Sequence, residues 1–235
     1  MARYCDTIGV IGGMGSYSTA YFFKRFLDSF EVDEEYERPR MIIDNYCTLP
    51  NKSRAYLHGE NEEELLNSII ISLQQLRMMG CTKSLIMCNT THIFVDAIFK
   101  RNKSLKKYFI DMLDCLSKRI CQDNVQKVLI WTTNNTIKTR VFEKYFSKYN
   151  IDVEYDIENN ETIVDELVLA GEKNILSDQT GNKYTELCNM YDGIVPIVLG
   201  CTELSVINSN FNKSKKLKIY DPVECVLEYI LMNLK

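Results

Sequence analysis

One short pattern occurs twice in this chain of 235 residues, and it limits the folds that the chain can adopt. Each copy is an apolar run that ends in a cysteine and a threonine, followed by a helix-like segment. The first copy spans residues 84–99 with Cys88, and the second spans residues 195–207 with Cys201. We interpret each apolar run as a buried strand of a parallel sheet. A cysteine between such a strand and a helix start lies where the helix dipole favours a thiolate.

A lone cysteine beside a helix cap would be interpreted as structural. Asn89 and the two threonines after it would then serve as ordinary N-cap residues. The repetition changes this interpretation, because two matching cysteines at the ends of equivalent strands indicate two halves of one active site.

The rest of the chain alternates between strand-like and helix-like segments. We therefore predict an α/β fold of two pseudo-symmetric domains, each with a parallel four-stranded sheet covered by helices on both faces. Ligands of such sheets bind outside the carboxyl ends of the strands, so Cys88 and Cys201 should flank one small ligand in a cleft between the domains. The expected strands are residues 6–11, 40–45, 84–87, 107–111, 127–131, 151–155, 195–200 and 217–222. The expected helices include residues 17–30, 62–79 and 139–149, and the expected polar turns include residues 49–54 and 132–136.

A glycine-rich turn, residues 12–16, follows the first strand and raises the question of a dinucleotide. Its spacing does not match G-x-G-x-x-G, because Ser18 stands where the third glycine belongs. No acidic residue clearly ends the next strand in the ribose-binding position, although Asp44 comes close. The turn is better suited to holding a smaller anion, such as a carboxylate, on its backbone N–H groups.

Composition excludes several other functions. A formal net charge of −4 gives no electrostatic basis for binding nucleic acid or an anionic membrane, and no apolar run reaches transmembrane length. The nine cysteines include no C-x-x-C pair, which favours a reducing cytoplasm and opposes a disulfide or zinc framework. Cys88 and His92 stand at a helical spacing that suits a metal, but no second pair of ligands is evident. We expect no metal and no cofactor.

Two acid/base groups on opposite faces of one carbon atom suit the inversion of a stereocentre. One thiolate would remove a proton from one face, and the other thiol would deliver a proton to the opposite face. A carbon acid is far weaker than a thiol, so the site must also stabilise the charge that develops. The sequence offers donors for this in the N–H groups of residues 12–15 and in the side chains of Asn89, Thr90, Thr133 and Thr202.

Three blocks, residues 8–15, 87–92 and 199–203, resemble the signature blocks of the aspartate/glutamate racemase superfamily, and they are most similar to its aspartate racemase branch. The resemblance spans nearly the whole chain. It implies a cofactor-independent amino-acid racemase, most specifically an aspartate racemase, with two Rossmann-like domains and usually a homodimer.

The resemblance also implies that the C-terminal segment returns to the first domain. We therefore expect residues 1–101 with 209–235 to form the first domain and residues 102–208 to form the second.

Carried over by position, Cys88 and Cys201 would be the two catalytic bases. Glu203 stands where aspartate racemases typically have glutamate and glutamate racemases have histidine, which implies a substrate-binding role. Its alternative role is that of a carboxylate that stabilises the start of a helix. The other residues that would line the substrate pocket are Met14, Lys52, Asn89, Thr90, Thr133 and Thr202.

Two departures from the branch concern substrate specificity. The branch typically has Pro-Asp-Arg-Thr where this chain has residues 50–53, so that Lys52 replaces a carboxylate-binding arginine. Lysine keeps the charge but lacks the bidentate geometry. Thr162 stands where the family tends to have a substrate-binding lysine. Racemase chemistry is therefore better supported than specificity for aspartate.

Two kinds of alternative remain open. Within the superfamily, the chain could be a glutamate racemase, an amino-acid racemase of broader specificity or a maleate isomerase-like enzyme, although the glycine block favours the amino-acid racemases. Outside enzymology, it could be a binding protein that senses a small carboxylate. The presence of both cysteines opposes that last alternative.

Overall fold

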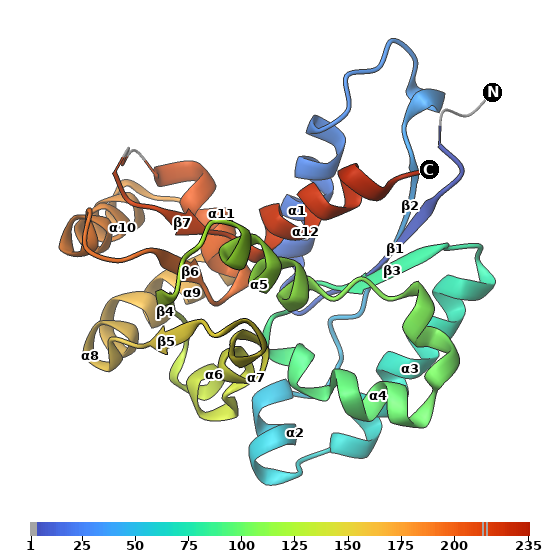
Figure 1. Ribbon diagram of the computed structural model, residues 1–235, viewed down its shortest axis with the longest axis horizontal. Coiled ribbons are helices and arrows are strands. Elements are labelled where there is room, and N and C mark those ends of the chain that lie inside the picture. The colour runs from blue at the N-terminus through green and yellow to red at the C-terminus, as the bar shows by residue number, and fades with distance from the viewer. Residues whose placement is uncertain (1–3, 213, 215) are drawn as a thin grey trace.

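The computed structural model describes residues 4–212, 214 and 216–235 (Figure 1). It has two α/β lobes, each built on a parallel sheet. The first sheet has three strands in the order β2-β1-β3, and the second has four in the order β5-β4-β6-β7. The strands are β1 (Thr7–Gly12), β2 (Arg40–Asn45), β3 (Lys83–Ile86), β4 (Lys127–Trp131), β5 (Asp152–Glu154), β6 (Ile197–Leu199) and β7 (Ile219–Tyr220).

Helices connect the strands and cover the sheets. They are α1 (Ser16–Asp28), α2 (Lys52–His58), α3 (Glu62–Met78), α4 (Val95–Arg101), α5 (Met112–Gln122), α6 (Asn134–Thr139), α7 (Val141–Phe146), α8 (Ile157–Asn159), α9 (Asp165–Glu172), α10 (Asp178–Tyr191), α11 (Thr202–Phe211) and α12 (Pro222–Asn233). Short 3-10 helices span Glu35–Glu37, Thr90–Phe94, Lys103–Tyr108 and Ser147–Tyr149, and a π-helical turn spans Asn160–Val164. Within the described residues, no helix is both long and apolar enough to cross a membrane.

Both sheets are buried on their two faces, as parallel sheets must be. In β4, Val128 and Ile130 pack on one side, whereas Leu129 and Trp131 pack on the other. The alternation follows from the strand geometry, which points successive side chains to opposite faces. The apolar runs of the sequence predict the inner strands β1, β3, β4 and β6 well, because most or all of their positions are buried, whereas the edge strands β2 and β5 are only partly buried.

The two sheets follow the same order, but their fourth positions differ. In the second lobe β7 pairs with β6, whereas in the first lobe the equivalent contact is a single parallel bridge between Ser84 and Phe109. The N–H of Ile110 donates to the carbonyl of Ser84 at 2.8 Å. The prediction of a strand over residues 107–111 is therefore wrong. The 3-10 helix Lys103–Tyr108 occupies the chain up to that point, and α5 begins directly afterwards.

The predicted polar turn at residues 132–136 is also wrong in part. The hydroxyl of Thr133 accepts a hydrogen bond from the N–H of Thr136 and caps α6. Arg140 then adopts a left-handed conformation with φ of 55°, which ends α6 before α7 begins. The single helix expected over residues 139–149 therefore begins later, with α7 over Val141–Phe146, and it continues as the 3-10 helix Ser147–Tyr149.

Helices α5 and α12 pack against both sheets and join the lobes. In α5, Met112 belongs to the core of the first lobe and Leu116 belongs to the core of the second. From α12, Ile230 packs on the first lobe. The chain ends beside its start, where the N–H of Cys5 donates to the carbonyl of Lys235 at 2.6 Å (Figure 1).

The C-terminal segment thus contributes to both lobes. Its strand β7 belongs to the second sheet, whereas α12 packs against α1 and α5. The expected division into residues 1–101 with 209–235 and residues 102–208 stays a prediction.

Asp221 caps α12 at the point where the two lobes meet. Its Oδ1 atom accepts hydrogen bonds from the hydroxyl of Ser205 at 2.7 Å and from the N–H of Val223 at 2.8 Å. Its Oδ2 atom is buried and has no hydrogen-bond partner among the described residues. Burial raises the pKa of Asp221 to about 6. The folded chain binds the proton of the Asp221 carboxyl group more tightly than the unfolded chain does, so protonation of Asp221 stabilises the fold. This stabilisation is fully present below the ordinary pKa of 3.8 and is lost as pH rises through about 6.

We predict that Asp221→Asn removes this pH dependence, since an amide keeps the acceptor oxygen and carries no charge. Between about pH 4.5 and about pH 7.5, the free energy of unfolding of the variant should gain about 1–3 kcal/mol relative to the wild type. Urea unfolding at several pH values measures this difference. Asp178→Asn, at an exposed position in the first turn of α10, is the matched control. Parallel pH profiles for wild type and Asp221→Asn would contradict the prediction.

Candidate active site

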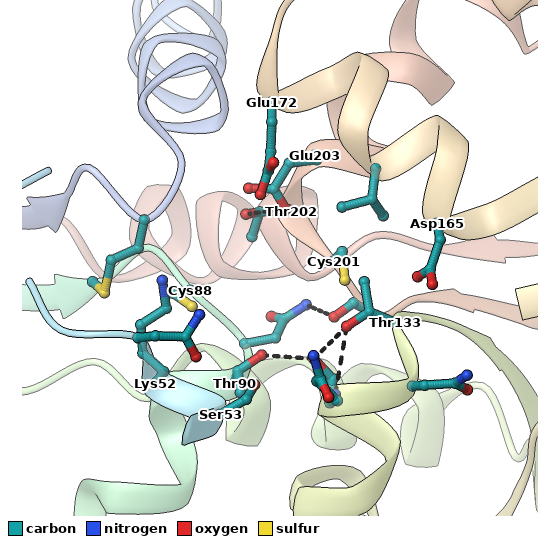
Figure 2. A pocket seen from close by; sticks show the side chains of 18 of the residues that line it. Lys52, Ser53, Cys88, Thr90, Thr133, Asp165, Glu172, Cys201, Thr202 and Glu203 are labelled. Carbon is teal, nitrogen blue, oxygen red and sulfur yellow. Dashed lines mark hydrogen bonds between the residues drawn. The ribbon is translucent and has the colours of Figure 1, made fainter. Parts of the chain in front are cut away.

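A cavity of about 430 Å³ opens between the two lobes at the carboxyl ends of the strands (Figure 2). Residues from α2, α6, α9 and the start of α11 line it, together with the segment after β3. All the residues that the sequence predicts for the site line this cavity: Met14, Lys52, Cys88, Asn89, Thr90, Thr133, Cys201, Thr202 and Glu203. Their individual roles remain predictions.

Asn89 does not cap a helix, contrary to the expectation from the sequence. The chain after Cys88 enters the 3-10 helix Thr90–Phe94, and the Asn89 side chain makes no capping hydrogen bond there. Its amide instead donates to the carbonyls of Leu199 and Gly200, at 3.3 and 2.9 Å. The residue next to Cys88 is therefore bonded directly to the strand end that precedes Cys201.

The two cysteines occupy equivalent places in the two lobes. Cys88 follows β3, and Cys201 follows β6 and caps α11. Both are buried, and Figure 2 shows their side chains on either side of the cavity. The hydroxyl of Thr132 lies 3.3 Å from the Cys201 sulfur.

Burial raises the pKa of the Cys201 thiol to about 12, and the negative charges of Glu203 and Cys88 act in the same direction. Hydrogen bonds from Thr132 and from the backbone of Thr133 oppose this effect but do not outweigh it. The expectation that the helix start favours a thiolate is therefore wrong for Cys201, because desolvation is the larger effect.

Glu203 connects the cavity to the glycine-rich turn. An added Cβ at Gly15 would lie 2.7 Å from the Oε1 atom of Glu203, so the carboxyl group fits against the glycine at the start of α1. Burial raises the pKa of Glu203 to about 7, and the nearby charge of Glu172 adds to this. The turn that was expected to hold a small anion thus has a carboxyl group of the chain itself beside it.

Lys52 lies at the first position of α2, where the sequence predicts only a polar loop over residues 49–54. Asn51 starts the helix, since its side chain accepts a hydrogen bond from the N–H of Arg54 at 3.0 Å. Among the described residues that line the cavity, Lys52 is the only one with a cationic side chain. Thr162 does not line it and donates to the carbonyl of Glu158 at 2.9 Å.

The hydroxyl groups of three threonines meet across the cavity floor. The Thr90 hydroxyl lies 2.9 Å from that of Thr136, and the Thr136 hydroxyl lies 3.2 Å from that of Thr133. Thr90 belongs to the first lobe, and the other two belong to the start of α6 in the second. This arrangement supplies O–H donors from both lobes, as the sequence predicts for Thr90 and Thr133.

One face of α9 lines the cavity and was missed by the sequence analysis. It carries Asp165, Val168, Leu169 and Glu172, whose i, i+3, i+4, i+7 spacing places them on one side of a helix. That spacing was the available signal. The other lining residues that were missed are Asn51, Ser53, Asn134, Asn135, Thr136 and Gly200.

His92 is fully buried behind Cys88. Its Nδ1 atom lies 2.8 Å from the carbonyl oxygen of Cys88, and its Nε2 atom accepts a hydrogen bond from the N–H of Met112 at 3.2 Å. Burial lowers the pKa of His92, which keeps the ring neutral with the proton on Nδ1. Both nitrogens are thus engaged with the backbone, so His92 is not placed to bind a metal together with Cys88. No group of three or more metal-ligating side chains is found within the described part of the chain.

Residues 11–230 match the model of a family described as Asp/Glu/hydantoin racemase. The chain therefore belongs to this racemase family, and it is a racemase-type enzyme. Its fold is similar to that of an aspartate racemase from Picrophilus torridus (TM-score 0.79, 22% identity, covering 98% of this chain and 96% of that one). It is also similar to an aspartate racemase homologue from Pyrococcus horikoshii (TM-score 0.66, 22% identity, 97% and 98%). A glutamate racemase from Francisella tularensis in complex with D-glutamate has the same fold (TM-score 0.64, 18% identity, 97% and 80%).

The effect of Glu203 on Cys201 can be tested without a substrate. We predict that Glu203→Gln lowers the pKa of Cys201, because it removes the neighbouring negative charge, and that iodoacetamide then alkylates Cys201 about tenfold faster near neutral pH. Mass spectrometry of the Cys201 peptide measures the rate, with the Cys88 peptide as an internal reference. Glu166→Gln is the matched control, because Glu166 is exposed on α9 and does not line the cavity. An unchanged Cys201 rate in Glu203→Gln would show that the carboxyl group does not act on the thiol.

Proposed function

We propose that the chain is a cofactor-independent amino-acid racemase in which Cys88 and Cys201 are the two acid/base groups. The observation that carries this proposal is that both cysteines line one cavity and reach it from the ends of the equivalent strands β3 and β6. Membership of the racemase family supports it.

The proposed reaction needs one thiolate and one thiol. The thiolate takes the proton from Cα, and the electron pair of the C–H bond is delocalised into the substrate's carboxylate. The thiol on the other side gives its proton to the opposite face of Cα and becomes a thiolate. The hydroxyls of Thr90 and Thr133 supply hydrogen bonds for this α-carboxylate as its charge increases.

Aspartate is the substrate that the sequence resemblance favours. In this assignment Lys52 binds one of its carboxylates, and the position of Lys52 in the cavity lining supports this. Glutamate, or a broader range of amino acids, is the alternative within the same mechanism. We also propose, from the sequence alone, that the chain acts as a homodimer in the cytoplasm.

A non-catalytic protein that binds a small carboxylate is the competing function from another class. Exchange of the Cα hydrogen for deuterium in D₂O separates the two, because a binding protein would leave that hydrogen in place.

We predict that Cys88→Ser and Cys201→Ser each abolish racemisation, because a hydroxyl is too weak an acid to form the required anion near neutral pH. Elimination from a β-chloro amino acid requires only one base. By resemblance to the glutamate racemases, Cys201 should deprotonate the L-form and Cys88 the D-form. Cys88→Ser should therefore still process the L-substrate, and Cys201→Ser the D-substrate.

Chiral chromatography for racemisation and chloride release for elimination measure the two activities. Full racemisation by either single variant would overturn the two-base mechanism. Reversed preferences for the β-chloro enantiomers would overturn only the assignment of the two faces.

We predict that Lys52→Ala raises KM for aspartate by about tenfold or more, and raises it far less for an uncharged amino acid. The reason is that the variant loses the cation that would bind the side-chain carboxylate. Arg54→Ala is the control, since Arg54 is exposed on the same helix, pairs with Glu60 and does not line the cavity. Equal effects of Lys52→Ala on both substrates would show that Lys52 does not recognise the side chain.

A further inference from the structure

We propose that the cavity selects an amino acid with a second ammonium group on its side chain, and that Asp165 and Glu172 of α9 make this selection. The inference rests on the proposed racemase function and names its substrate class, a diamino acid. It departs from aspartate, which the sequence resemblance favours, because the charges that line the cavity do not suit a second carboxylate.

The first observation is the balance of charge. The described lining residues include three carboxyl groups, those of Asp165, Glu172 and Glu203, and one cation, Lys52. Figure 2 shows Glu172 and Glu203 together on one side of the cavity and Asp165 further along it, with Lys52 across from them near Cys88. Every α-amino acid brings one α-carboxylate and one α-ammonium group. In this inference Lys52 binds the α-carboxylate, in place of the side-chain carboxylate that it binds in the aspartate assignment. A second carboxylate would face carboxyl groups without a second cation from the described lining.

The second observation is an unsatisfied acceptor at Asp165. Its Oδ1 atom is buried, and within the described part of the chain it has no hydrogen-bond partner. A buried carboxylate oxygen is costly to leave unpaired, so a cationic donor in the cavity would stabilise Asp165 once its carboxyl group turns toward that donor. Burial and the charge of Glu161 both raise the pKa of Asp165, and a cation bound there would reverse that effect.

The third observation is the spacing along α9. Val168 and Leu169 lie on the same face, between Asp165 and Glu172 in sequence, and line the same cavity. This face therefore offers an apolar middle with a carboxyl group toward each end. The side chain of a diamino acid matches this face, since its methylene groups can contact the apolar middle and its terminal ammonium group can pair with a carboxyl group.

The test compares three substrates of equal carbon-chain length and different side-chain charge: 2,4-diaminobutyrate, asparagine and aspartate. The readouts are kcat/KM for racemisation by chiral chromatography and for Cα deuterium exchange by mass spectrometry. We expect the wild type to prefer diaminobutyrate over aspartate by about tenfold or more, with asparagine between them.

The variant Asp165→Asn/Glu172→Gln should lower the ratio of kcat/KM for diaminobutyrate to kcat/KM for aspartate by about tenfold or more. Glu166→Gln is the matched control on α9; Glu166 pairs with Lys183 outside the cavity lining, so the ratio should stay unchanged. A thermal-unfolding midpoint close to that of the wild type shows that the variant is folded.

Three results would overturn the inference. A wild-type preference for aspartate would show that the cavity accepts a second carboxylate. An equal loss on all three substrates in the α9 variant would show that the two carboxyl groups bind only the α-ammonium group. Equal kcat/KM values for the three substrates would show that the cavity does not select by side-chain charge, and would leave the proposed racemase function intact. No Cα exchange with any of the three substrates would count against the proposed function itself.

Discussion

The buried amide of Asn89 joins the two halves of the site. It donates from the residue after Cys88 to the carbonyls of Leu199 and Gly200, directly before Cys201. Both ends of this contact are withdrawn from water, so a change in the angle between the lobes would leave a buried donor without its acceptor. Helices α5 and α12 reinforce the same geometry by packing against both sheets. The Thr90 and Thr136 hydroxyls also meet between the lobes, at 2.9 Å, so polar contacts inside a shared apolar framework hold the two thiols in place.

Burial in the cavity favours the protonated forms of Cys201 and Glu203. Burial raises the pKa of Cys201 and of Glu203, and each of their anions would disfavour the other. A bound ammonium group changes this balance, because a positive charge in a site of low dielectric favours the neighbouring anions. In the proposed mechanism, substrate binding and formation of the reactive thiolate are therefore coupled through the same charges. A protonated thiol is also less prone to oxidation than a thiolate.

The sequence predicts the strands and the paired cysteines because both depend on local pattern. Strands buried on both faces appear in the sequence as continuous apolar runs. Each cysteine directly follows such a run, so each lies at the carboxyl-terminal edge of its sheet. The error over residues 107–111 has the same origin, since a short apolar run does not distinguish a strand from a 3-10 helix followed by the N-cap Asp111. The face of α9 that lines the cavity could have been predicted from the helical spacing of its residues. The contact of Asn89 with Gly200 could not be predicted from the sequence, because it depends on how the two lobes are placed.

The two lobes support their cysteines differently, although their strand order is the same. Four residues after Cys88 stands His92, whose Nε2 atom lies 3.7 Å from Asp111. Four residues after Cys201 stands Ser205, whose hydroxyl donates to Asp221 at 2.7 Å. Each acidic residue caps the helix that joins the lobes, α5 in one case and α12 in the other. The neutral ring of His92 reaches the carbonyl of Cys88, whereas Glu203 adds a carboxyl group beside Cys201. The pseudo-symmetry therefore places two thiols around one cavity but gives them unlike surroundings, so the two sulfurs differ in their electrostatic environment.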